Sequence, residues 1–316
     1  MNPEETVKTL RSACQRRGWA VEVIPTARVA EARSTIEAAR NDGLLDEGFC
    51  AQYLEGAFSW VAPEGLPDAT SVIVIVVPAP SYRLAFVSSG RKREVLVPPT
   101  YVGYRPNADV VRTDIAEIIA PHGYRIVAAR LPEKTLAVRS GLARYGCNNI
   151  TYTPGLGSFA QIVTAWSDLP VPVDPWRRAA LLDRCATCTA CIRACPTGAI
   201  PETGAGRFLL RAERCLTYLN EQEDDFPAWV DHRAHNAMVG CMRCQAACPE
   251  NRGVAGLVEE GPVFTEEETD LLLAATPRDR LPPGTLAKID GLQTFLTHEL
   301  LCRNLAVLLA QPAPDT

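Results

Sequence analysis

The stretch Cys185-Ala-Thr-Cys188-Thr-Ala-Cys191-Ile-Arg-Ala-Cys195-Pro196 decides the fold of the middle of the chain, and a related run, Cys241-Met-Arg-Cys244-Gln-Ala-Ala-Cys248-Pro249, follows it. The first run has the spacing C-x2-C-x2-C-x3-C-P, at which three thiolates bind one [4Fe–4S] cluster while the fourth binds a second cluster. The two runs therefore predict a domain built around two [4Fe–4S] clusters.

The eight thiolates divide by this crossing rule into two sets of four. The first cluster is expected to be bound by Cys185, Cys188, Cys191 and Cys248. The second is expected to be bound by Cys195, Cys241 and Cys244, and Cys215 is the best candidate for the missing ligand because it lies between the two runs. We expect the remaining thiols to be packed side chains rather than ligands, namely Cys14, Cys50, Cys147 and Cys302. For Cys147, contact with a cofactor metal or a substrate is the alternative, since it lies in a glycine-rich loop.

Zinc sites and disulfides are the alternatives for these cysteines. Zinc sites do not require the x2-x2-x3 run with a following proline. Residues 1–5 are polar and acidic with no apolar segment behind them, so we expect no signal peptide. A reducing, cytoplasmic location follows as the expectation, and disulfides are rare there. We therefore favour iron–sulfur clusters over both alternatives.

The composition is that of an ordinary globular protein. The chain has 316 residues, enough for at least two domains, with 47% apolar and 22% charged residues. The longest apolar run, Ser71–Pro78, is far shorter than a membrane-spanning helix and predicts a buried central strand, so we expect no membrane partner. The net charge of −5 argues against a broad nucleic-acid surface.

Helix and strand patterns alternate around this strand. We expect a hairpin from residues 83–87 and 94–97, a helix at 108–119 and a strand at 124–129. Helices are also expected at 265–275, with acidic residues in the first turn, and at 295–309. This alternation indicates an α/β or a layered α+β domain beside the cluster domain.

Two loops carry further information. Four glycines in residues 141–159 mark places where the backbone turns tightly or comes close to another group: Gly141, Gly146, Gly155 and Gly157. They follow a helix pattern and not a strand, so a Rossmann site is excluded. Residues 98–106 are rich in proline and tyrosine without periodicity, and such a loop could form a pocket wall or only a rigid connection.

With both regions in view, the chain resembles the epoxyqueuosine reductase family, corrinoid-dependent iron–sulfur enzymes that are also similar to reductive dehalogenases. The resemblance is close in residues 185–200 (CATCTACIRACPTGAI), in Arg214-Cys215-Leu216 and in residues 241–251 (CMRCQAACPEN). It is looser upstream, where Glu133-Lys134, Ser140-Gly141-Leu142, Gly146 and Asn149 look like the family's Glu-Lys/Arg, Ala-Gly-Leu-Gly and Gly-Lys-x-Thr segment. It spans roughly residues 68–309.

The resemblance implies an α+β protein: a corrinoid-binding domain like the nitroreductase fold, a ferredoxin-like two-cluster domain and a short helical C-terminus. The corresponding ranges are 1–60 for an N-terminal segment of helices and a strand, 61–175 for the corrinoid-binding-like domain, 176–260 for the cluster domain and 261–316 for the C-terminal helices.

The departures from the family concern the substrate. The family's proton-donating Asp is replaced by Val127, its Asp-Tyr-His segment by the region around residues 99–104, and its C-terminal tRNA-reading repeats shrink to about one helix pair. We therefore interpret the chain as a divergent paralogue and do not expect tRNA as its substrate. Tyr101, Tyr104 and Glu133 are the candidate proton donors, and for Glu133 the alternative is a helix N-terminal charge that favours the helix dipole.

The resulting hypothesis is an oxidoreductase in which two clusters reduce a cobalamin that acts on a small substrate. The ring would lie between the 101–104 loop and residues 141–159, approached closely by the four glycines, with polar contacts from Asn148, Asn149, Thr151, Tyr152 and Ser158. Reduced ferredoxin or flavodoxin is the expected electron donor. The alternative is a non-catalytic electron carrier or reductive activator of a separate corrinoid protein.

Overall fold

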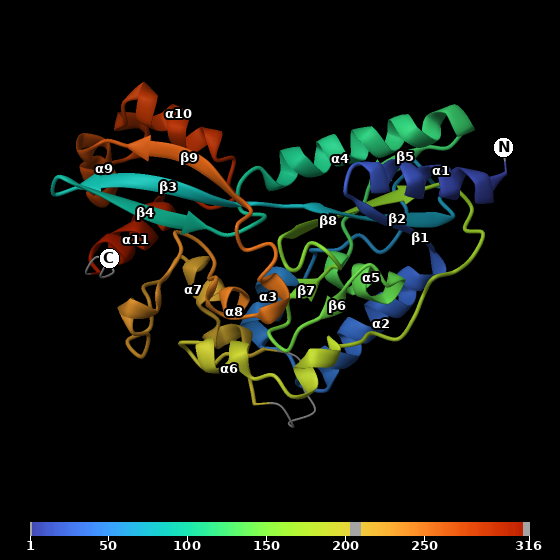
Figure 1. Cartoon of the computed structure of the whole chain (residues 1–316), viewed down its shortest axis with the longest axis horizontal. Coiled ribbons are helices and arrows are strands. Elements are labelled where there is room, and N and C mark those ends of the chain that lie inside the picture. Colours follow the sequence, from blue (N-terminus) through green and yellow to red (C-terminus); the bar gives the residue numbers. More distant parts are fainter. Residues whose placement is uncertain (1, 203–209, 312–316) are drawn as a thin grey trace.

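The computed structural model describes residues 2–202 and 210–311. Two sheets lie end to end, and the short helices of the cysteine-rich segment lie along one side of them (Figure 1). Residues 203–209 of the predicted cluster domain and residues 312–316 of the predicted C-terminal segment fall outside the described residues.

The four-stranded sheet has the order β1-β2-β8-β5, and every neighbouring pair is antiparallel. Its strands are β1 (Ala20–Pro25), β2 (Ser71–Pro78), β8 (Ala160–Ser167) and β5 (Ile126–Ala128). Strand β2 is central and is buried from Ser71 to Val77, which confirms the strand predicted from the apolar run. Antiparallel pairing identifies the sheet as a layered α+β arrangement.

Helices cover both faces of this sheet (Figure 1). Helices α1 (Pro3–Arg16) and α4 (Tyr104–Ile119) pack on the face that carries Ile73 and Ile75. Helices α2 (Ala27–Asn41) and α5 (Glu133–Ser140) pack on the face that carries Val72, Val74 and Val76. Successive side chains of a strand point to opposite faces, so a continuous apolar run such as β2 supplies both cores.

The predicted hairpin is confirmed as β3 (Ser81–Ser88) and β4 (Arg91–Val97). The hairpin leaves the first sheet, because β2 ends at Pro78 and Pro80 follows before β3, and a proline cannot donate a ladder hydrogen bond. Instead β3 pairs in parallel with β9 (Val258–Phe264), a strand that the sequence analysis missed. The rings of Phe86 and Phe264 stack 4.7 Å apart at the centre of this second core.

Three C-terminal helices complete the second core: α9 (Glu266–Leu273), α10 (Pro283–Gly291) and α11 (His298–Leu309). Thr265 caps α9 in a capping box with Glu268, so the predicted acidic helix start is confirmed. The hairpin precedes the cysteine-rich segment in the sequence, and these helices follow it. The predicted domain ranges, with boundaries at residues 175 and 260, assign the hairpin and the helices to different domains.

The cysteine-rich segment contains only short helices, α6 (Ala190–Ala194), α7 (Leu216–Asn220) and α8 (Arg243–Ala246). Helix α3 (Glu47–Tyr53) lies against it, and the two-residue strands β6 (Arg144–Tyr145) and β7 (Thr151–Tyr152) form a small ribbon between it and the four-stranded sheet (Figure 1). None of the helices among the described residues combines the length and apolar character that crossing a membrane requires.

Candidate functional site

A cavity of about 280 Å³ lies between the four-stranded sheet, the hairpin region and the cysteine-rich segment. We call it the tyrosine pocket; it is lined by Pro98, Pro99, Thr100, Tyr101, Tyr104, Glu133, Lys134, Ile150, Thr151, Ser158, Ala160, Ile162, Thr217, Cys241 and Gln245. The three predicted proton donors thus share one cavity with two predicted cofactor contacts, Thr151 and Ser158. Residues 98–101 form a wall of this pocket, which is one of the two roles that the sequence left open.

Tyr104 and Glu133 form a hydrogen-bonded pair in the pocket. Tyr104 is the first residue of α4 and Glu133 the first of α5, and the Tyr104 hydroxyl donates to Glu133 Oε2 over 2.6 Å. Burial raises the pKa of Glu133 to about 7, although the bond from Tyr104 and the charge of Arg112 oppose this shift. A carboxyl group with this pKa is partly protonated at neutral pH and can donate a proton.

Tyr101 is held in a different way. Its hydroxyl donates to Glu221 Oε1 over 2.6 Å, and the hydroxyl of Tyr53 donates to the other oxygen of the same carboxylate over 2.8 Å. The Tyr101 ring stacks on Phe295 with a centroid distance of 5.5 Å. Burial raises the pKa of Tyr101 well above its usual value. Glu221, the carboxylate bonded to Tyr101, does not line the pocket, whereas Glu133 does, so the Tyr104 and Glu133 pair is the better placed proton donor.

Lys134 also lines the pocket, although it was not among the predicted site residues. Its side chain is exposed to the open pocket, and its Nζ donates to the carbonyl oxygen of Asn149 over 3.3 Å. Desolvation by the surrounding protein lowers the pKa of Lys134. The only signal in the sequence is its place after Glu133, in a pair that resembles the family's Glu-Lys/Arg pair.

The four thiols of the first predicted set lie around one small cavity. It is lined by Gly146, Cys147, Asn148, Tyr152, Leu182, Arg184, Cys185, Cys188, Ala190, Cys191, Cys248, Pro249 and Glu250. Cys248 therefore lies with the first three cysteines of the first run, as the crossing rule predicts. Among the described residues, no three His, Cys, Asp or Glu side chains converge on a point suited to a single metal ion.

The thiols of the second predicted set lie close enough to affect one another's pKa values. Burial raises the pKa of Cys244, and Cys241 and Cys215 raise it further. Burial also raises the pKa of Cys241, with an added contribution from Cys195. The side-chain amide of Asn236 donates to Cys241 Sγ over 3.2 Å. Because Cys241 lines the tyrosine pocket, this second set lies beside the pocket; the ligand assignment itself remains a prediction.

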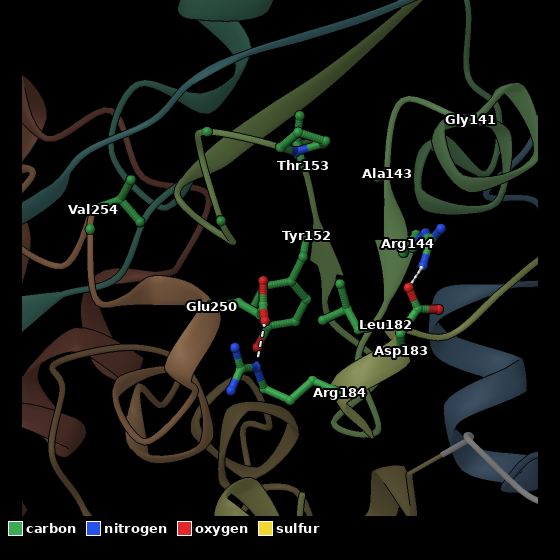
Figure 2. Close-up of a pocket in the computed structure, with 14 residues that line it drawn as sticks. Gly141, Ala143, Arg144, Tyr152, Thr153, Leu182, Asp183, Arg184, Glu250 and Val254 are labelled. Carbon is green, nitrogen blue, oxygen red and sulfur yellow. Dashed lines mark hydrogen bonds and ion pairs between the residues drawn. The ribbon is translucent and has the colours of Figure 1, made fainter. Parts of the chain in front are cut away.

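A larger cavity has a volume of about 880 Å³, and we call it the glycine pocket. Figure 2 draws the residues that line it. It is lined by Gly141, Ala143, Arg144, Tyr152, Thr153, Pro154, Gly155, Gly157, Leu182, Asp183, Arg184, Glu250, Gly253 and Val254. Two ion pairs join residues of its lining, Arg144 with Asp183 at 2.7 Å and Arg184 with Glu250 at 2.9 Å (Figure 2). Each arginine is paired with a carboxylate, so the pocket presents little net charge.

The predicted cofactor contacts are therefore divided among three cavities. Thr151 and Ser158 line the tyrosine pocket, whereas Tyr152 lines both the glycine pocket and the first thiol cavity. Thr151 and Tyr152 are neighbours in β7 and point to opposite sides because side chains alternate along a strand. Gly141, Gly155 and Gly157 line the glycine pocket, Gly146 and Asn148 line the thiol cavity, and Asn149 contacts Lys134 through its carbonyl.

Three of the four glycines permit close contacts within the protein, Gly141 with the Arg177 side chain and Gly146 and Gly157 with asparagine side chains. A Cβ atom on Gly157 would lie 2.4 Å from Asn251 Oδ1, and one on Gly146 would lie 2.5 Å from Asn148 Oδ1. Asn251 also accepts from the backbone N–H of Ser158 over 2.9 Å and so joins residues 157–158 to the cysteine-rich segment. At Gly146 and Gly157, the group that comes close to the backbone is therefore an asparagine side chain.

Comparison with known proteins identifies the cysteine-rich segment. Residues 184–251 match the family described as the 4Fe-4S double cluster binding domain. The chain is 31% identical over 139 residues to an epoxyqueuosine reductase from Staphylococcus aureus and 34% identical over 137 residues to one from Pseudomonas aeruginosa. The chain resembles the epoxyqueuosine reductases. These matches cover 44% and 42% of this chain, but only 34% and 36% of the two relatives.

The likeness of fold extends over nearly the whole chain. A crystal structure of selenomethionine-labelled epoxyqueuosine reductase superposes with a TM-score of 0.68 at 21% identity, covering 98% of this chain and 82% of that one. The epoxyqueuosine reductase from Streptococcus thermophilus gives a TM-score of 0.63 at 17% identity, with 95% and 80% covered. The predicted resemblance is confirmed, and the fold is a mixed α and β arrangement similar to that of these reductases.

Proposed function

We propose that this protein is an iron–sulfur oxidoreductase that carries electrons through two [4Fe–4S] clusters to a cobalamin bound in the tyrosine pocket. The observation that carries the proposal is the composition of this pocket. The Tyr104 and Glu133 pair, which can supply a proton, shares its lining with Cys241 of the second thiol set. An electron source and a proton source thus meet in one cavity, as a reduction requires.

The residues of the pocket suit one face of a corrinoid. Thr151 and Lys134 can donate hydrogen bonds to amide groups at the edge of a ring, and Ala160 and Ile162 offer apolar contact. The Ser158 hydroxyl already donates to Gln245 Oε1 over 2.8 Å. The cavity of about 280 Å³ encloses only part of so large a group, so the rest would extend beyond the pocket. When bound, cobalamin supplies a low-valent metal that donates electrons to the substrate. We propose that the layered domain that would hold it corresponds to the nitroreductase-like domain that the resemblance implies.

The Tyr104 and Glu133 pair has the role of proton donor in this proposal. Glu133 holds the proton at its carboxyl group near neutral pH, and Tyr104 fixes the direction of that group through the 2.6 Å bond. Val127, at the family's Asp position, is partly buried against the apolar core and has no proton to give. We expect turnover to fall as pH rises through about 7, because Glu133 then loses its proton.

We propose a small-molecule substrate and a cytoplasmic electron donor such as reduced ferredoxin or flavodoxin. One solved epoxyqueuosine reductase, similar to this chain with a TM-score of 0.62, is in complex with a tRNA stem loop. The difference at Val127 and the net charge of −5 support a different substrate here. The second candidate function, an electron carrier for a separate corrinoid protein, does without a ligand in the tyrosine pocket.

The test is anaerobic reconstitution with iron, sulfide and hydroxocobalamin, followed by gel filtration and spectroscopy of the Co(II) state. We compare the wild-type chain with Ala160→Phe, which fills the tyrosine pocket, and with Val254→Phe, a matched change in the glycine pocket. We expect cobalamin to co-elute with the wild type and Val254→Phe but not with Ala160→Phe. Protein that has two intact clusters and retains no cobalamin would support the electron carrier instead.

A further inference from the structure

A fifth thiol lies at the first cluster cavity. Cys147 lines this cavity with Cys185, Cys188, Cys191 and Cys248, the four predicted ligands of the first cluster. The side chain is only 8% exposed and packs with Cys191 and Cys185 in one apolar group. A [4Fe–4S] cluster needs four cysteine ligands, so this cavity has one thiol more than its cluster requires.

The backbone around Cys147 holds the thiol in place. Cys147 lies in the tight turn between β6 and β7, which is closed by hydrogen bonds from Asn149 N to Gly146 O over 2.9 Å and from Gly146 N to Ile150 O over 2.8 Å. The Asn148 amide donates to the Tyr152 hydroxyl over 2.9 Å and fixes the next residue. The position of the thiol therefore follows from β6 and β7 and does not depend on a cluster being bound.

The same turn is tied to the segment that carries Cys185. Tyr145, two residues before Cys147, donates its N–H to Ala180 O over 3.1 Å and accepts from Leu182 N over 2.8 Å. Cys185 N in turn donates to Leu182 O over 2.9 Å, and Cys147 Sγ lies 3.9 Å from the carbonyl oxygen of Cys185. Cys147 is thus held beside Cys185 by a continuous set of backbone contacts.

We propose that Cys147 is a reserve ligand of the first cluster that can bind iron in place of Cys185. The inference rests on the proposed assignment of the first thiol set. Loss of Cys185 leaves Cys188, Cys191 and Cys248, and the Cys147 thiol loses its proton and binds the iron that Cys185 held. The number of thiolates and the charge of the site stay the same in this exchange. The reserve ligand comes from the ribbon of β6 and β7, which lies beside the four-stranded sheet, and not from the cysteine-rich segment.

The test compares alanine variants, because a serine hydroxyl could itself bind iron. After anaerobic reconstitution of the full chain, we measure iron and sulfide per chain and the electron paramagnetic resonance spectrum of the reduced protein. We expect about eight irons in the wild type, in Cys147→Ala and in Cys185→Ala, and about four in the double variant. Cys195→Ala, from the second set, is the control and should fall to about four irons while Cys147 is intact.

The outcomes separate the two proposals. A wild type with fewer than about eight irons contradicts the proposed ligand assignment. A wild type with about eight irons and Cys185→Ala with about four contradicts only the role of Cys147. If Cys185→Ala does not fold, the rate at which a chelator removes iron from Cys147→Ala and from the wild type decides. A reserve ligand predicts faster loss of half the iron in Cys147→Ala, and equal rates would overturn it.

Discussion

At the scale of single residues, the raised pKa of Glu133 predicts a specific pH dependence of stability. The folded pKa of about 7 lies above the unfolded value, so the folded state binds the extra proton between these values. The ionised group therefore destabilises the fold increasingly as pH rises through this window, by about 2 kcal/mol above pH 7 after allowance for solvent.

Glu133→Gln removes this titration. We expect its free energy of unfolding to improve relative to the wild type by about 2 kcal/mol between pH 5 and pH 8, measured by denaturant titration at both pH values. Glu260→Gln is the control, since the Glu260 side chain is 69% exposed and should change little. An identical pH dependence in the wild type and Glu133→Gln would show that Glu133 has an ordinary pKa.

The assignment of Cys215 is a second prediction at this scale. Its place is inferred from its position between the two runs, from the family resemblance at residues 214–216 and from its effect on the pKa of Cys244. We expect Cys215→Ala to bind about four irons after reconstitution where the wild type binds about eight. Cys302→Ala removes a buried thiol that lies 3.5 Å from His298 Nε2 and should keep about eight. Full iron content in Cys215→Ala would mean that another residue completes the second set.

The spacing of the cysteines predicted that Cys248, from the second run, lies with Cys185, Cys188 and Cys191, and the four thiols do line one cavity. Tyr101 could be named from the sequence, but its partner Glu221 lies 120 residues away. The polar residues around β7 were expected to line one site, and the alternation of the strand sends Thr151 and Tyr152 into different cavities. A two-residue strand such as β7 has no periodicity in the sequence, so the side that each of its residues faces could not be predicted.

At the scale of elements, Arg303 joins α11 to the end of α7. Its guanidinium donates to the carbonyl oxygens of Leu219 at 3.1 Å, Asn220 at 3.2 Å and Gln222 at 2.6 Å, and it also contacts Asp224 O. The last carbonyls of a helix have no partner inside the helix, and a cation there is favourable for the helix dipole.

We expect Arg303→Leu to lower the free energy of unfolding by about 2 kcal/mol, since it removes several charge-assisted bonds. The melting temperature, followed by the visible absorbance of the reconstituted clusters, should fall with it. Arg33→Leu removes a surface ion pair with Glu37 and should cost less than about 0.5 kcal/mol. Equal effects of the two substitutions would show that Arg303 does not hold α7 in place.

Periodicity identified the central strand β2, the hairpin of β3 and β4 and the helices α4, α9 and α11, but it identified neither β8 nor β9. Val258-Glu-Glu-Gly-Pro-Val-Phe264 contains a glycine and a proline, which weaken the pattern of a strand. Its place at the sheet edge beside β3 explains this composition, because only one side of an edge strand must donate hydrogen bonds. The partner of β3 is therefore set by tertiary contacts such as the Phe86 and Phe264 stack, and not by local sequence.

At the scale of the whole molecule, the charge balance predicts weak binding to tRNA. A chain with a net charge of −5 releases few counterions from phosphates unless its basic residues are concentrated on one face. We expect no binding of a tRNA stem loop at micromolar protein in about 0.15 M salt, measured by fluorescence anisotropy. The epoxyqueuosine reductase that was solved with such a stem loop is the positive control. Micromolar affinity that weakens as salt increases would mean that tRNA is a ligand after all.

The parallel pairing of β3 with β9 also constrains when the protein can finish folding during its synthesis. The hairpin ends at Val97 and its missing neighbour begins at Val258, so the ribosome makes the entire cysteine-rich segment in between. At a synthesis rate of 5–20 residues per second, Phe264 is made about 10 to 30 s after Phe86. The apolar face around Phe86 stays uncovered during this time. Cofactor loading by cellular assembly factors can therefore begin on a nascent chain whose second sheet is still open. Molecular chaperones that shield the hairpin in this interval should raise the yield of active protein.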